Sequence, residues 1–212
     1  MSRVRVLGID EAGRGCVLGP LVVASFMVEA SVEAALWEAG VNDSKALSAK
    51  RRDEVRLRIA AMGAATVRHI SATAIDQGNL NRLEEEAIAE LVHAARPDRV
   101  IVDALGHPST LPTTVERLRG LVGPEVDAEW LMEPKADAKY APVAAASIFA
   151  KTTRDAALAA LDAEYGPFGS GYPSDPLTRG WLAEWSATGR DWPPFVRTRW
   201  GTIAKVAQQS MF

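Results

Sequence analysis

The stretch "VRVLGIDEAGRGCVLGPLVVASFMV" (Val4–Val28) decides the fold, because it reads as two strands joined by a turn. Apolar runs at Arg3–Asp10 and about Val17–Val28 flank "GRGCVLGP", which is rich in turn-forming residues. This pattern predicts an antiparallel hairpin. The first strand ends in a pair of carboxylates, Asp10 and Glu11, and Gly-Arg-Gly follows two residues later. A hydrophobic strand that ends in two acids calls for a chemical explanation.

The rest of the chain alternates helical and strand patterns, which is typical of an α/β fold. Strand one pairs with strand two, so we expect a mixed sheet of about five strands flanked by helices, with a C-terminal helical region. The division expected is a catalytic domain over 1–177 and a helical extension over 178–212. The further elements predicted are strands at Ala65–Ser71, Asp98–Gly106 and Glu125–Leu131, and helices at Ala49–Met62, Asn79–Ala95, Pro112–Gly120, Pro142–Tyr165 and Thr178–Thr188.

Composition narrows the class of protein. The 212 residues are 48% apolar, which is enough for a substantial core. A net charge of −3 argues against binding nucleic acid by bulk charge alone, but it allows a local basic groove. The single cysteine, Cys16, is expected to be a small packing residue, and it leaves no pair for a disulfide. With neither a signal peptide nor an apolar run long enough to span a bilayer, a cytoplasmic protein is expected.

Acidic residues recur at places where strands end. Asp103 follows "VIV" as Asp10 follows strand one, and Asp137 lies just before the long helix. Any one of them alone reads as a turn or cap residue. Ligand sites in α/β sheets gather at the carboxyl ends of strands, so we expect these acids to converge. Clustered carboxylates repel one another, and Mg²⁺ or Mn²⁺ would relieve the repulsion. Two such ions are suited to phosphodiester hydrolysis.

Five motifs resemble those of ribonuclease HII, the type 2 ribonuclease H family. They are "GIDEAGRGCVLGPLVVA", "DSKALS", "VIVDA", "KADAKYAPVAAASIFAKTTRD" and "GSGYPSDP", and the resemblance runs over nearly the whole chain. It implies a ribonuclease H fold and a site in which Asp10, Glu11, Asp103 and Asp137 bind two Mg²⁺ or Mn²⁺ ions. It also implies hydrolysis of RNA in RNA–DNA hybrids and nicking of duplex DNA 5′ of an embedded ribonucleotide, leaving 3′-hydroxyl and 5′-phosphate ends.

The resemblance further implies a set of nucleic-acid contacts. The Gly-Arg-Gly segment is expected to read the 2′-hydroxyl and the neighbouring phosphate, and a tyrosine to stack on the following deoxyribose. Two residues of "DSK" are expected to contact phosphate. The residues concerned are Gly13, Arg14, Gly15, Tyr172, Ser44 and Lys45. The final "QQSMF" is similar to peptides that dock on sliding clamps, against the alternative of a frayed end. Family members are commonly monomers.

Several alternatives stay open. A non-catalytic hybrid-binding module and another metal-dependent nuclease, such as a junction resolvase or a 3′-exonuclease, would share the fold. Arg197 and Arg199 could line a duplex backbone, or they could be surface charges packed against Trp200. Asp155 lies 18 residues after Asp137, roughly 27 Å along a helix, so a structural role is expected for it.

Overall fold

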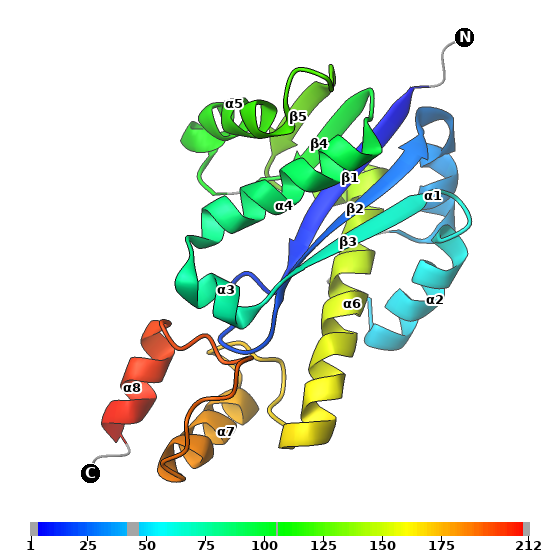
Figure 1. Cartoon of the computed structure of the whole chain (residues 1–212). Coiled ribbons are helices and arrows are strands. Elements are labelled where there is room, and N and C mark those ends of the chain that lie inside the picture. The colour runs from blue at the N-terminus through cyan, green and yellow to red at the C-terminus, as the bar shows by residue number, and fades with distance from the viewer. Residues whose placement is uncertain (1–3, 42–46, 105, 210–212) are drawn as a thin grey trace.

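The computed structural model describes residues 4–41, 47–104 and 106–209. Its centre is a five-stranded sheet in the order β3-β2-β1-β4-β5, as Figure 1 shows. β1 pairs antiparallel with β2 and parallel with β4, so the sheet is mixed, as the sequence predicts. The strands are β1 Arg5–Ala12, β2 Leu21–Glu29, β3 Ala64–Ile70, β4 Arg99–Asp103 and β5 Glu129–Glu133.

Helices cover both faces of the sheet. One face packs on α6, α1 and α2, and the other packs on α4 and α5. The α-helices are α1 Glu33–Ala39, α2 Ala49–Ile59, α3 Ala72–Gln77, α4 Leu80–Ala95, α5 Leu111–Val122, α6 Ala141–Tyr165, α7 Pro176–Ala187 and α8 Gly201–Gln209. Three short 3₁₀ turns are η1 Ala30–Val32, η2 Pro108–Thr110 and η3 Ala136–Ala138. None of the helices within the described ranges is both long and apolar enough to cross a membrane.

β1 is the central strand, and α6 lies directly against it. Leu7 and Ile9 pack toward α4, while Val6 packs toward the start of α6. β1 therefore has two buried faces, and Val4, just before its start, is 46% exposed. A Cβ added to Gly8 would overlap the backbone of Pro142, so only glycine allows this approach of strand and helix.

The connection between β1 and β2 is longer than predicted. Strand two was expected from about Val17, but it begins at Leu21. The N–H groups of Val17 and Leu18 both donate to the carbonyl of Gly171, at 2.8 and 3.2 Å. A distant loop therefore takes the hydrogen bonds that a hairpin ladder would use. The sequence pattern also missed α1, a seven-residue helix that ends at Gly40.

The C-terminal part packs around an aromatic cluster. Phe168 stacks on Phe195 and meets Trp181 edge-on, with ring centroids 5.6 and 5.8 Å apart. Val17 and Leu18 of the β1–β2 connection belong to the same buried cluster. Figure 1 shows α7 and α8 at the end of the molecule toward which β1 runs. The C-terminal segment thus lies beside the edge where the predicted acids gather.

Candidate functional site

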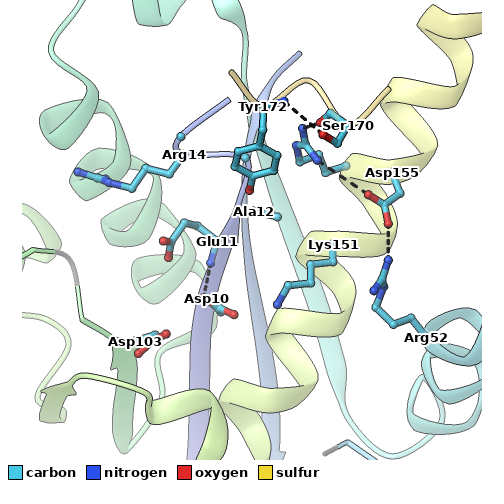
Figure 2. Close-up of a pocket in the computed structure, with 13 residues that line it drawn as sticks. Asp10, Glu11, Ala12, Arg14, Arg52, Asp103, Lys151, Asp155, Ser170 and Tyr172 are labelled. Atoms are coloured by element: carbon cyan, nitrogen blue, oxygen red, sulfur yellow. Dashed lines mark hydrogen bonds and ion pairs between the residues drawn. The ribbon is translucent and has the colours of Figure 1, made fainter. Parts of the chain in front are cut away.

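Three of the four predicted acids line one cavity. Asp10 and Glu11 lie at the carboxyl end of β1, and Asp103 ends the neighbouring parallel strand β4. Ile9 pairs with Val102, so the acids follow at matching positions on the two strands. They open into a cavity of about 410 Å³ (Figure 2). Sheet topology thus brings together carboxylates that are more than 90 residues apart in the sequence.

Burial and mutual repulsion work against charge on Asp10 and Glu11. Burial raises the pKa of Asp10 to about 6, although the Lys151 ammonium and a hydrogen bond from Ser147 oppose the rise. Burial, and next the Asp10 carboxylate, raise the pKa of Glu11 to about 8. Asp103 adds to the repulsion in both cases. A positive charge bound in the cavity would therefore favour the ionised forms of Asp10 and Glu11.

Asp137 is placed differently. It is buried in η3, and it is not among the residues that line the cavity. Its neighbour Ala136 donates its N–H to the Asp103 carboxylate at 3.0 Å, so η3 touches the acidic edge through its backbone. Across the described ranges, no three His, Cys, Asp or Glu side chains converge as a ready-made metal site. Asp10, Glu11 and Asp103 thus share the cavity, and Asp137 lies in the adjoining η3 turn.

A lysine that the sequence reasoning missed lies opposite the acids. Lys151 extends from α6 into the cavity (Figure 2) and donates to the Ser147 hydroxyl at 2.6 Å. Ser147, Lys151 and Asp155 are spaced four residues apart, so they share one face of α6. That spacing was visible in the sequence, and it marks the helix face that looks toward β1.

Asp155 also lines the cavity, paired with an arginine. Its carboxylate accepts from Arg52 of α2 at 2.8 Å, and Figure 2 shows this pair at the side of the cavity. The ion pair joins α6 to α2 at the wall of the cavity, and the structural role expected for Asp155 stays a prediction. Arg52 itself was missed, because nothing in "AKRRDEVR" distinguishes it from its charged neighbours.

The Gly-Arg-Gly loop forms another wall, and its two glycines differ. Gly13 has φ +91°, and a Cβ there would lie 2.7 Å from the Pro20 carbonyl oxygen. Gly15 lacks a positive φ, and a Cβ there would come no closer than 3.6 Å, to the ring of Tyr172. Folding therefore requires glycine at position 13. At position 15 the protein leaves room for a side chain, so the missing Cβ keeps the cavity wall open.

The Arg14 side chain turns away from the cavity toward α4. Figure 2 shows it extending away from Tyr172. Its guanidinium pairs with Glu84 and donates to Asn81, both on α4. The Glu84 side chain is fully buried, whereas that of Arg14 is 33% exposed. This pair could not be predicted, because Glu84 sits in a run of three glutamates that is typical of solvated surface charge.

Tyr172 stands over the Gly-Arg-Gly loop. It is 39% exposed, lies against Gly15, and points into the cavity in Figure 2. The Arg154 guanidinium lies 5.3 Å from the centre of its ring, and it also donates to Cys16 Sγ at 2.9 Å. Arg154 thus packs against the Tyr172 ring, and part of the ring remains exposed. Cys16 is fully buried, in accordance with a packing role.

The remaining expectations concern the two residues of "DSK" and the two arginines of "VRTRW". Ser44 and Lys45 lie outside the described residues. Arg197 is fully buried beneath the loop, so it neither lines a duplex backbone nor forms a surface charge, but it does pack against Trp200 as the second interpretation expected. Arg199 is exposed.

Comparison with known proteins agrees with the geometry. The family model for ribonuclease HII matches residues 7–203. A ribonuclease HII from Archaeoglobus fulgidus is 42% identical over 209 residues, which cover 96% of this chain and 97% of that protein. The crystal structure of ribonuclease H2 from Pyrococcus horikoshii has a TM-score of 0.84 at 35% identity, covering 98% of this chain and 99% of that one.

A second solved structure is the complex of the A. fulgidus ribonuclease HII with PCNA. It has a TM-score of 0.84 at 40% identity and covers 93% of this chain and 95% of that one. A match of this extent spans the sheet, the acidic edge and the C-terminal aromatic cluster. The chain therefore belongs to the ribonuclease HII family, type 2 ribonuclease H enzymes that cleave the RNA of RNA–DNA hybrids.

Proposed function

We propose that this protein hydrolyses the RNA strand of RNA–DNA hybrids and also nicks duplex DNA 5′ of an embedded ribonucleotide, leaving 3′-hydroxyl and 5′-phosphate ends. The observation that carries the proposal is the single cavity shared by Asp10, Glu11 and Asp103 with the Gly-Arg-Gly loop and Tyr172. Acids able to support hydrolysis and a wall suited to reading a sugar lie within one site. A substrate could therefore be recognised where it is cut.

The donor set fits hard divalent cations. Every candidate ligand is a carboxylate, the chemistry that Mg²⁺ and Mn²⁺ prefer. The pKa values of Asp10 and Glu11 are raised because the nearby cations, Lys151 and Arg14, do not offset burial and mutual repulsion. Asp10, Glu11, Asp103 and Asp137 are proposed to hold two ions. Such ions, when bound, activate water and stabilise the departing 3′-oxygen.

The remaining residues bind and orient the substrate. Lys151, on the opposite wall, would attract the phosphate and keep Asp10 ionised. The open side of the Tyr172 ring is available to stack on a deoxyribose. Glycine at position 15 lets a sugar approach the backbone, where N–H donors can meet the 2′-hydroxyl that distinguishes RNA from DNA. Ser44 and Lys45 are proposed to contact phosphate.

Cleavage mapping tests the proposal. The substrate is a duplex with one central ribonucleotide, and the comparison is its all-DNA twin, each with and without Mg²⁺. We expect one nick, 5′ of the ribonucleotide, only with Mg²⁺, and loss of the nick in Asp103→Asn. Asp53→Asn, which removes an exposed carboxylate on α2, is the matched control and should cut normally. Equal cutting of both duplexes would favour another nuclease, and binding without cutting would favour a hybrid-binding module.

A sliding clamp is proposed as a protein partner through "QQSMF" (208–212). The observation that favours it is the PCNA complex of the A. fulgidus relative. Deletion of residues 208–212 should abolish binding to a purified clamp in calorimetry while leaving the nicking rate unchanged. Retained binding would place the contact elsewhere. The protein is proposed to be a monomer, which size-exclusion chromatography with light scattering measures.

A further inference from the structure

A fully buried arginine lies behind the Gly-Arg-Gly loop. Arg197 donates to three backbone carbonyls: to Gly13 at 2.7 Å, to Arg14 at 2.9 Å, and to Gly19 at 3.1 and 3.2 Å. Burying a guanidinium costs free energy unless its N–H donors are hydrogen-bonded, so a buried arginine needs acceptors at fixed positions around it. The planar fork matches carbonyls that all face one way. Arg197 therefore fixes both ends of the loop.

These hydrogen bonds determine where the loop's N–H groups point. In a planar trans peptide the C=O and the following N–H point in opposite directions. The Gly13 carbonyl faces Arg197, so the N–H of Arg14 is turned away from Arg197. The Arg14 carbonyl also faces Arg197, so the N–H of Gly15 is turned away from Arg197 as well. Two successive donors of a loop that lines the cavity therefore point away from its buried side.

Arg197 is itself held by the segment that carries it, Pro194–Trp200, here called the strap. Its own N–H donates to the Val17 carbonyl at 2.9 Å, and its guanidinium lies 5.3 Å from the centre of the Trp200 ring. Asp76 of α3 accepts from the N–H and hydroxyl of Thr198, at 2.6 and 2.7 Å. The strap is thus tied to the β1–β2 connection on one side and to α3 on the other.

We propose that Arg197 is a positioning residue for ribose recognition: it orients the peptide units of the Gly-Arg-Gly loop so that the N–H groups of Arg14 and Gly15 can meet a 2′-hydroxyl. Arg197 touches no substrate and acts only through the loop. The inference rests on the proposed function. Lysine in its place would keep the charge, but a single ammonium cannot hold three carbonyls in one plane.

The test compares binding of two duplexes, one with a single ribonucleotide and its all-DNA twin, by fluorescence anisotropy with Ca²⁺ in place of Mg²⁺. Two hydrogen bonds to a hydroxyl correspond to a wild-type preference of roughly tenfold. In Arg197→Lys we expect the preference to fall to about twofold or less, with affinity for the all-DNA twin unchanged. Arg190→Lys, an exposed arginine ahead of the strap, is the matched control and should keep the full preference. Simple destabilisation lowers the folded fraction for both duplexes alike and leaves their ratio unchanged.

A second variant covers the case in which Arg197→Lys does not fold, as judged by circular dichroism. Asp76→Ala removes the carboxylate that holds Thr198 and leaves the hydrogen bond from Thr73 to the Pro194 carbonyl in place. It should reduce the preference in the same direction. A folded Arg197→Lys or, failing that, a folded Asp76→Ala with the wild-type preference would overturn the inference. A wild-type protein that binds both duplexes equally and cuts neither would instead overturn the proposed function.

Discussion

Replacing Gly13 by alanine should lower the urea concentration at which the protein unfolds, whereas replacing Gly15 by alanine should leave it nearly unchanged. At Gly13 the φ of +91° is unfavourable for a residue with a Cβ, at a cost of about 1–3 kcal/mol. The new Cβ would also lie 2.7 Å from the Pro20 oxygen, 0.7 Å inside an ordinary 3.4 Å contact. Because that oxygen belongs to the backbone, it cannot rotate aside, and such overpacking adds about 1–3 kcal/mol. We expect a total loss of about 3 kcal/mol.

Urea titration followed by tryptophan fluorescence measures the difference. With a slope of about 2 kcal/mol/M, the midpoint of Gly13→Ala should fall by about 1.5 M. Gly15→Ala should remain within about 0.5 kcal/mol of wild type, since its Cβ makes only a normal contact with Tyr172. Under the proposed function, Gly15→Ala should fold normally but cut ribonucleotide-containing duplex more slowly than wild type, because the methyl group enters the cavity. Equal midpoints for the two variants would refute the reasoning.

Three further outcomes are expected. Arg14→Ala leaves the buried Glu84 without its partner and should cost about 3 kcal/mol in urea titration, most of it recovered in the Arg14→Ala/Glu84→Leu double variant; no recovery would deny the pairing. Hydrogen bonds from the Ser170 hydroxyl, its N–H and the Leu177 N–H hold the pKa of Asp175 below its usual range. The stabilisation from Asp175 is therefore present above about pH 4 and lost as pH falls through the lower folded pKa, so titrations at pH 7 and pH 3 should show Asp175→Ala closer to wild type at pH 3; a gap that widens would reverse the sign. Mg²⁺ should raise the thermal midpoint of the wild type but hardly that of Asp103→Asn; equal shifts would place the ion elsewhere.

The sheet was predictable because its signals are local. The apolar run, the turn residues and the acid at the end of β1 lie within one short stretch, and β4 repeats the pattern. Parallel strands then bring Asp10 and Asp103 to one edge, which needs no knowledge of side-chain contacts. These features follow from periodicity and chain order alone.

The rest of the site depends on contacts that no local pattern encodes. Lys151 enters the cavity because Gly8 lets α6 press against β1, and a half-turn rotation of that helix about its axis would move the side chain to the opposite face. Glu84 looks like one acid among three, and only its burial against Arg14 separates it from the others. Arg197 looked like a surface charge because its carbonyl partners lie at the other end of the chain.

The distance along the chain between Gly13 and Arg197 has a consequence for synthesis. The two residues are 184 positions apart, and chains are made and begin to fold from the N-terminus. A nascent polypeptide on the ribosome can pair β1, β2 and β3 long before the partner of the Gly-Arg-Gly carbonyls has been translated. Order in this turn therefore arrives among the last events of biogenesis, and a prematurely terminated product keeps its acidic edge without it.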